Sequence, residues 1–247
     1  MPFPQFRTFL ASTLALVLAA SAFANTAVQP VIRHERAGWV ARHEGFVELA
    51  RKGGINVLFI GDSITDGWRN EAKGAKAIWD REFAPLGAAN FGIGGDRTQH
   101  VLWRLENGEL DGIKPKVVVL MIGTNNTGFE ADQTTRKNTP TETVAGVTAI
   151  VRKIRQSLPP TKILLLAVFP RGEKPDDLRR QQVVEINAAI ARLHDGKSVH
   201  FLDIGGKFLT SDGTLPKEVM PDFLHPSLKG YEIWAAAIRE PLARLLK

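Results

Sequence analysis

The stretch that decides the fold is Ile55-Asn-Val-Leu-Phe-Ile-Gly-Asp-Ser-Ile-Thr-Asp-Gly-Trp68. It opens with an apolar run rich in β-branched side chains, which predicts a strand buried on both faces of a sheet. The run breaks at Gly61, so Asp62 and Ser63 follow directly after the carboxyl end of the strand. In open α/β sheets, ligands bind at that edge. Ser63 is therefore a candidate nucleophile, and the open alternative is that Asp62 and Ser63 merely cap the next helix.

Further apolar runs alternate with helical patterns along the rest of the chain. The expected strands are 88–92, 117–122, 163–169 and 199–202, and amphipathic helices are expected over 31–52, 68–84, 141–157, 175–194 and after residue 226. This alternation predicts a parallel sheet covered on both sides. We therefore expect an α/β protein: a three-layer α/β/α, flavodoxin-like domain with a five-stranded parallel sheet. The polar segment 127–140 is longer than a usual connection and indicates a functional loop.

The first 24 residues differ in composition from the rest. A single positive charge at Arg7 precedes an almost wholly apolar run, and Ala22-Phe-Ala24 is a small-x-small cleavage pattern. This layout predicts a signal peptide over 1–24, a single domain over 25–247, and export to the periplasm or the medium. The apolar run is shorter than the ~20 residues of a membrane span, so no stable span is expected. An uncleaved anchor is the alternative.

Composition excludes several kinds of function. The net charge is +6, but the basic residues are dispersed and no nucleic-acid motif is present, so we expect a solvated surface and no nucleic-acid partner. The chain has no cysteine, which excludes disulfides, thiol catalysis and thiolate metal sites. No histidine–carboxylate set has ligand spacing. We therefore expect no metal and no other cofactor.

Polar residues follow three of the expected strands: Ser63, the Gly94-Gly95 turn and Asn125. Each is an ordinary turn residue when taken alone. The carboxyl ends of parallel strands meet at one edge, however, and acyl transfer needs a nucleophile with oxyanion donors beside it. A phosphate-binding loop is the rival interpretation of the glycines, but Arg97 stands where the dinucleotide pattern needs another glycine.

The general base is expected to be His225. Asp222 lies three residues before it, so one turn can place the carboxylate against the imidazole while the other ring nitrogen faces a serine. The alternative is a helix start with a capping aspartate. His34 and His43 are nine residues apart and are expected on the surface. Thr65 replaces the second glycine of Gly-x-Ser-x-Gly, which argues against an ordinary α/β-hydrolase elbow.

Together these blocks resemble the SGNH (GDSL-type) hydrolases. The matching residues, in the family's order, are Gly61-Asp-Ser-Ile64, Asn90-Phe-Gly-Ile-Gly-Gly-Asp96, Gly123-Thr-Asn125 and Asp222-Phe-Leu-His225. Segments 91–96, 101–110 and 123–126 closely resemble the catalytic subunits of platelet-activating factor acetylhydrolases of the intracellular type. The predicted export and the long 127–140 segment look unlike those subunits.

The resemblance implies a serine esterase. Ser63 would attack the ester, His225 would move the proton and Asp222 would orient His225. Ser63 and Gly95 would offer backbone N–H groups to the oxyanion, together with the Asn125 amide. The implied substrate is a small-molecule ester, an acetylated sugar or a short-chain lipid ester, and a homodimer is left open. The alternatives are a non-catalytic secreted binding module and an acyltransferase on the same fold.

Three residues adjoin the expected catalytic groups along the chain: Ile64, Thr124 and Leu224. Connectivity therefore predicts that they line the acyl side of the site. Ile64 and Leu224 are bulky, which predicts a shallow pocket for acetyl groups.

Overall fold

The computed structural model of the protein describes residues 25–247. Its centre is one sheet of five parallel strands in the order β2-β1-β3-β4-β5. The strands are β1 (Val57–Gly61), β2 (Ala88–Gly92), β3 (Val117–Met121), β4 (Lys162–Leu166) and β5 (Val199–Leu202). This sheet confirms the predicted fold class.

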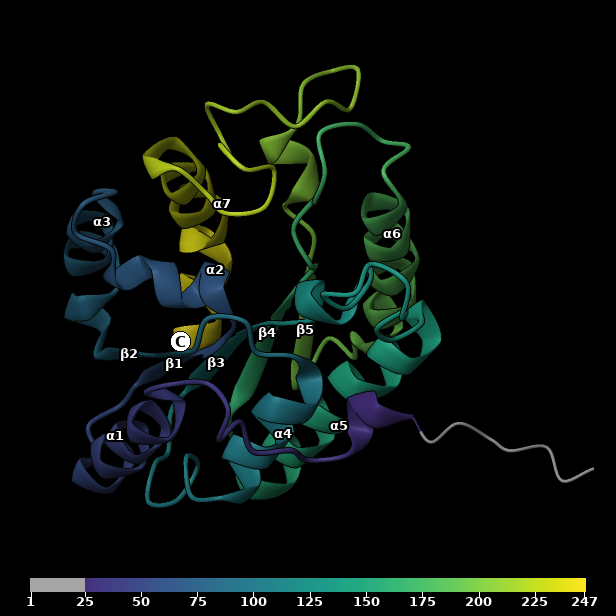
Figure 1. Cartoon of the computed structure of the whole chain (residues 1–247). Helices are drawn as coiled ribbons and strands as arrows, with labels where there is room; N and C mark the ends of the chain where they lie inside the picture. The colour runs from purple at the N-terminus through teal and green to yellow at the C-terminus, as the bar shows by residue number, and fades with distance from the viewer. Residues whose placement is uncertain (1–24) are drawn as a thin grey trace, which may run out of the picture.

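Helices cover both faces of the sheet (Figure 1). One face carries α1 (Trp39–Lys52), α4 (Thr98–Glu106), α5 (Pro140–Ser157) and α6 (Leu178–Ile190), and the other carries α2 (Ser63–Asp66), α3 (Ala75–Glu82) and α7 (Leu228–Leu246). Among residues 25–247, none of the helices combines the length and the apolar character that crossing a bilayer requires. The predicted signal peptide, 1–24, lies outside the described residues.

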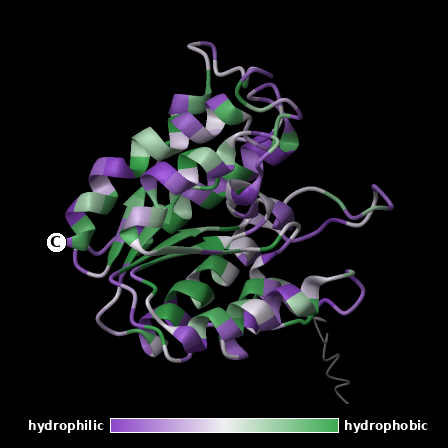
Figure 2. Ribbon diagram, turned by 90° about the vertical axis from the view of Figure 1, so that its left-hand side faces the viewer, coloured by the Kyte–Doolittle hydropathy of each residue, from purple (hydrophilic) through white to green (hydrophobic). Residues whose placement is uncertain are grey.

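The strands feed two apolar cores because their side chains alternate. Leu58 and Ile60 of β1 point into the core under α1, α4, α5 and α6, whereas Val57 and Phe59 point into the core under α3 and α7. Figure 2 shows the apolar strands between helices whose polar surfaces face outward. Each fully buried side chain of this kind contributes about 1.5–3 kcal/mol. The sheet is therefore a firm support for the loops at its carboxyl edge.

The chain reverses its winding direction between β1 and β3. It passes from β1 to the edge strand β2 and then returns to the other side of β1 to form β3. Loops after two such neighbouring strands splay to opposite sides, and the crevice between them is the usual ligand site of open α/β sheets. Ser63 follows β1 and Asn125 follows β3. The topology therefore places both candidates at this crevice.

Glycines shorten two of the expected helices. The helix expected from residue 31 begins only at Trp39, because Gly38 before it adopts a left-handed conformation (φ 74°). Residues 31–38 instead form an irregular strap. The helix expected over 68–84 divides into a 3₁₀ turn at Gly67–Arg69 and α3, with a left-handed Gly74 (φ 72°) ahead of α3. Helix α2 is an additional turn of helix that already starts at Ser63.

Candidate active site

Ser63 is the first residue of α2, and Asp62 caps that helix. The Asp62 Oδ1 atom accepts a hydrogen bond from the Ile64 backbone N–H at 2.9 Å. The capping interpretation is thus correct for Asp62, and it leaves the Ser63 side chain available. Successive helical side chains point about 100° apart. Ser63 therefore remains partly exposed at the start of α2, while Ile64 turns into the core.

The structure brings Ser63, His225 and Asp222 into one chain of hydrogen bonds. The Ser63 Oγ atom lies 2.9 Å from His225 Nε2, and His225 Nδ1 lies 2.7 Å from Asp222 Oδ2. Asp222 Oδ1 also accepts the backbone N–H of His225 at 2.7 Å. Asp222 therefore fixes both the ring and the backbone of the residue that faces Ser63.

Two aspartates near Ser63 differ in their ionisation. Burial acts to raise the pKa of Asp222, but the hydrogen bonds from the His225 ring and backbone outweigh it, so the pKa is lowered. Burial raises the pKa of Asp62 to about 7, against the hydrogen bond from Ile64. Asp222 is thus held ionised, as a partner for an imidazolium must be.

The Gly94-Gly95 turn packs against Ser63. A Cβ atom on Gly94 would lie 3.6 Å from the Ser63 Cβ, and Gly95 adopts a left-handed conformation (φ 79°). On the other side of this turn, the Asn125 amide donates to the Asp96 carbonyl at 2.9 Å. The residues expected after β1, β2 and β3 therefore gather at one edge of the sheet.

The structure does not assemble the predicted acyl pocket. Ile64 is 1% exposed and Thr124 is 0% exposed, so both belong to the interior. Leu224 is half-buried, but it lines a separate cavity with Asp222 and Phe223. Adjacency in sequence failed as a guide because neighbouring residues of a helix or turn face different directions. This part of the sequence prediction is wrong for Ile64 and Thr124.

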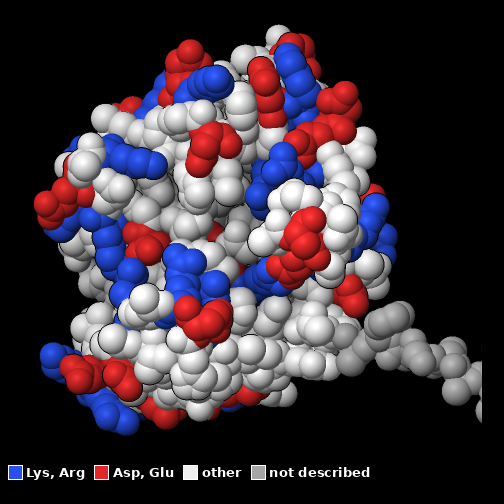
Figure 3. All heavy atoms as spheres, in the orientation of Figure 1, with Lys and Arg blue, Asp and Glu red and all other residues white. Residues whose placement is uncertain are grey.

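A cavity of about 330 Å³ opens beside Ser63. Its lining residues are Ser63, Asp66, Gly67, Arg69, Asn70, Lys73, His225 and Tyr231. Most of them are polar or charged. Figure 3 shows Lys and Arg side chains around the hollow in the middle of this face, beside α2. Within residues 25–247, no three His, Cys, Asp or Glu side chains gather into a set that could hold a metal ion.

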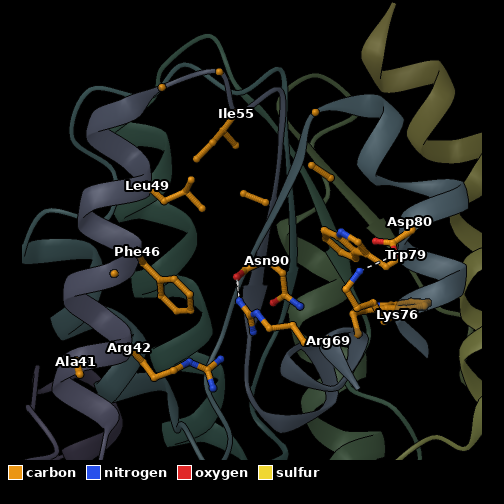
Figure 4. Close-up of a pocket in the computed structure, with 17 residues that line it drawn as sticks. Ala41, Arg42, Phe46, Leu49, Ile55, Arg69, Lys76, Trp79, Asp80 and Asn90 are labelled. Carbon is orange, nitrogen blue, oxygen red and sulfur yellow. Dashed lines mark hydrogen bonds and ion pairs between the residues drawn. The ribbon is translucent and has the colours of Figure 1, made fainter. Parts of the chain in front are cut away.

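A larger cavity of about 680 Å³ lies at the β2 edge and is separate from Ser63. Figure 4 shows its apolar wall, with Phe46 and Leu49 of α1 opposite Trp79 of α3. Arg69 lines both cavities and donates to the backbone carbonyls of Asn90 and Gly92 at the edge strand. This cavity holds none of the expected catalytic residues, so we place the candidate active site at the smaller, polar cavity.

A buried ion network behind the site was missed by sequence reasoning. Arg104, which is 0% exposed, donates to Asp96 Oδ2 at 2.9 Å and to Glu109 Oε2 at 2.6 Å. Trp39 donates to the other Asp96 oxygen at 2.7 Å. The same Arg104 donates to the Phe91 carbonyl at 3.0 Å. One guanidinium therefore joins α4 to β2 and to the turn that carries Gly95.

His43 also belongs to this network, contrary to the expected surface position. It is 5% exposed, and its Nδ1 atom lies 3.0 Å from Glu109. The sequence contained an indication of this burial. His43 lies four residues after Trp39 and three before Phe46, which places all three on one helical face. The apolar neighbours on that face indicated burial.

The 127–140 segment is fastened to the start of α4. Arg97 forms a two-pronged ion pair with Glu130, with both contacts at 2.6 Å. Asn126 is fully buried, and its amide donates to Asn138 at 2.8 Å. Because Arg97 follows Gly95 by only two residues, this loop is held close to the candidate oxyanion side of the site.

Comparisons with known proteins identify relatives along most of the chain. The model of the GDSL-like lipase/acylhydrolase family matches residues 59–233. Human platelet-activating factor acetylhydrolase IB subunit alpha1 is 41% identical over 84% of each chain, and the rat alpha2 subunit is 40% identical over 85% of each.

Solved structures share the fold at lower identity. A GDSL-like lipase from Bacteroides thetaiotaomicron is 21% identical, with a TM-score of 0.63 over 83% of this chain and 98% of that one. An acetylxylan esterase from Geobacillus stearothermophilus is 22% identical, with a TM-score of 0.60 over 78% and 94%. At these identities the likeness supports the architecture alone.

The relatives contradict the predicted export. These relatives are named acetylhydrolase IB subunits, and they match 84–85% of the chain. The sequence resembles the acetylhydrolases of the intracellular type, which does not agree with export. The expectation of a periplasmic or secreted protein rested on composition in 1–24 alone. The prediction of export is therefore wrong.

Proposed function

The chain belongs to the GDSL-like lipase/acylhydrolase family, and we propose that it hydrolyses short-chain esters, above all acetyl esters, with Ser63 as the nucleophile. The observation that carries the proposal is the hydrogen-bonded series Ser63–His225–Asp222, with distances of 2.9 and 2.7 Å. A serine hydroxyl is a weak nucleophile until a neighbouring base takes its proton. His225 stands where such a base is needed.

The proposed reaction has two halves. In the first, His225 Nε2 accepts the Ser63 proton as the Oγ atom attacks the ester carbonyl, and His225 then protonates the departing alcohol. In the second, His225 activates a water molecule that releases the acid from Ser63. The ionised Asp222 carboxylate holds the ring and stabilises the imidazolium through both halves.

Negative charge develops on the carbonyl oxygen during each half of the reaction. We assign its stabilisation to the backbone N–H groups of Ser63 and Gly95 and to the Asn125 side-chain amide. The Asn125 amide has two N–H bonds, and one of them already donates to Asp96. The second is left for the oxyanion. Donors fixed in this way need no rearrangement as the charge appears.

The cavity supports a short acyl group. Its walls beside Ser63 include Asp66 and Asn70, which offer a long hydrocarbon chain no apolar surface. A methylene that is buried against apolar groups contributes about 0.8 kcal/mol, and a methylene that is not forgoes it. The curated relatives are named acetylhydrolases. Both considerations favour acetate over longer acids.

Hydrolysis of p-nitrophenyl esters tests the proposal. We expect Ser63→Ala and His225→Ala each to abolish nearly all acetate hydrolysis, and the double variant to lose little more because the pair acts as a unit. Ser157→Ala, at an exposed position, is the matched control. Wild-type rates in Ser63→Ala would refute the nucleophile. An activity optimum at octanoate would refute the short acyl group.

A further inference from the structure

Arg36 in the 31–38 strap lies over the glycine turn beside Ser63. A Cβ on Gly95 would come within 2.7 Å of its Nη1 atom, and a Cβ on Gly94 within 3.3 Å of its Nη2 atom. The same Gly94 position is 3.6 Å from the Ser63 Cβ, so the guanidinium lies at most about 7 Å from the Ser63 Cβ. A positive charge therefore borders the candidate nucleophile on its oxyanion side.

Arg33 adds a second guanidinium at the same turn. Its Nη1 atom would lie 3.2 Å from a Cβ on Gly95, and this atom is buried without a hydrogen-bond partner. Its nearest acid oxygen, on Asp96, is 3.5 Å away, and Asp96 is already bonded to Arg104. A buried N–H without an acceptor destabilises the fold. Arg33 therefore adds a second positive charge at the Gly95 turn.

Lys73 provides a further cation beside Ser63. It lines the same cavity as Ser63 and His225, and it is exposed. Within residues 25–247, neither Lys73 nor Arg36 forms an ion pair. Other cations nearby do have acidic partners: Arg42 and Arg69 share Asp66, and Arg33 pairs with Glu35.

Three acids near Ser63 and Arg36 are already paired. Asp66 is bound by two arginines at 2.6 Å each, and Asp222 is bound by His225 at 2.7 Å. Glu35 pairs with Arg33 at 3.2 Å. Arg36 and Lys73 thus place two positive charges near the reacting serine that no ion pair among residues 25–247 neutralises.

From this arrangement we infer that the ester carries a negative charge on its alcohol half, which Arg36 and Lys73 bind. The inference rests on the proposed esterase function and specifies its substrate class. A carboxylate or a phosphate group supplies the acceptor oxygens that a guanidinium pairs with. An acetyl ester of a hydroxy acid and an acetyl ester of a phosphorylated alcohol both fit.

Aryl acetates that differ only in charge test the inference. The probes are phenyl acetate, 4-acetoxybenzoate, 4-acetoxyphenyl phosphate and the cationic 4-acetoxyphenyl-trimethylammonium. For Arg36→Gln and for Lys73→Gln we expect kcat/KM to fall about 5- to 10-fold on the two anionic esters, mainly through KM. On phenyl acetate it should change less than 2-fold, and on the cationic ester it should rise. The larger loss on the carboxylate or on the phosphate identifies which anion the site prefers.

Arg51→Gln is the matched control, because it removes one exposed positive charge at the far end of α1, where the chain neighbours Gly112 ahead of β3. It should leave the ratio between anionic and neutral esters unchanged. Comparing ratios cancels differences in leaving-group reactivity. Equal losses on all four esters would overturn the inference, since they would mean a structural role for Arg36.

A binding measurement separates this inference from the proposed chemistry. In Ser63→Ala, which retains both cations, 4-acetamidobenzoate should bind more tightly than its neutral analogue acetanilide. Adding Arg36→Gln should reduce the difference, and adding Lys73→Gln as well should abolish it. If acetanilide binds as well as the benzoate, the inference is wrong even where esters are hydrolysed. If the benzoate binds selectively but no ester is hydrolysed, the proposed function fails and the anion site stands.

Discussion

The two halves of the candidate site are built from different kinds of structure. Ser63, Gly95 and Asn125 follow buried strands, and behind them Asp96 and Arg104 are both 0% exposed. Asp222 and His225 lie on the irregular chain between β5 and α7, with side chains 55% and 33% exposed. The sheet half is part of the folding core. The loop half is held by its own hydrogen bonds.

This difference predicts that substitutions in the loop half lower activity with little effect on stability, whereas substitutions in the sheet half lower stability. Substitutions in the loop half remove contacts that are local and partly solvated, so they cost little unfolding free energy. Substitutions in the sheet half leave buried polar groups without partners, which is costly. Four substitutions probe this separation, in order of expected effect.

Asp222→Asn should have the largest effect, on activity alone. The amide can still accept the backbone N–H of His225, but it cannot hold the imidazole in the required tautomer. We expect kcat to fall about 10³–10⁴-fold. The loss should be smaller than in Ser63→Ala or His225→Ala. The free energy of unfolding, measured in urea, should change by less than about 1 kcal/mol. A loss of several kcal/mol would contradict the proposed independence of the loop half.

Arg104→Met should show the opposite pattern. It leaves the buried carboxylates of Asp96 and Glu109 without their shared cation, and breaking a buried pair in this way costs about 3–5 kcal/mol. Urea denaturation measures the loss. Arg244→Met, which breaks an exposed pair with Glu240, is the control and should cost less than about 1 kcal/mol. Equal effects of the two variants would disprove the supporting role of the network.

Asn125→Ala tests the sheet half for a chemical role. Removing one oxyanion donor usually lowers kcat by about 10²–10³-fold. KM for p-nitrophenyl acetate should change much less, because the bond is strongest in the transition state. A rise in KM with unchanged kcat would instead mean that Asn125 only binds the ground state.

Asp62→Asn should have the smallest effect, and one that depends on pH. Burial raises the pKa of Asp62 to about 7 from a usual 3.8, so between these values the folded protein holds a proton that the unfolded chain has lost. The contribution of Asp62 to the free energy of unfolding of the wild type therefore falls as the pH rises from 3.8 to about 7. From pH 5 to pH 7 the stability of the wild type relative to Asp62→Asn should drop by about 2 kcal/mol. A difference that is flat with pH would show that Asp62 is ionised throughout.

Much of the fold could be predicted because it depends on local patterns. The apolar run of β1 and its sudden end at Gly61 indicated a buried strand and a ligand edge, and the same pattern recurs at β3. Asp222 and His225 were suggested by their spacing alone, since one turn joins them. These features involve residues near one another in the sequence.

The parts that could not be predicted depend on contacts distant in sequence or on local direction. Arg104 and Asp96 lie in the same segment of the sequence. The burial of this ion pair, however, depends on Trp39, which lies 57 residues before Asp96. Arg36 reaches Gly95 only because Gly38 makes α1 begin at Trp39, not at residue 31 as the periodicity favours. The acyl pocket was misplaced because connectivity says where Ile64 is in the chain and not which way it points.

Covalent labelling tests the central claim, that Ser63 is a nucleophile activated by His225, most directly. The protein would be treated with a fluorophosphonate, and the modified residue identified by peptide mass spectrometry. We expect one phosphonyl group per chain, on Ser63, and labelling at least about 10³-fold slower in His225→Ala. A label on another serine, or equal labelling rates with and without His225, would contradict the account.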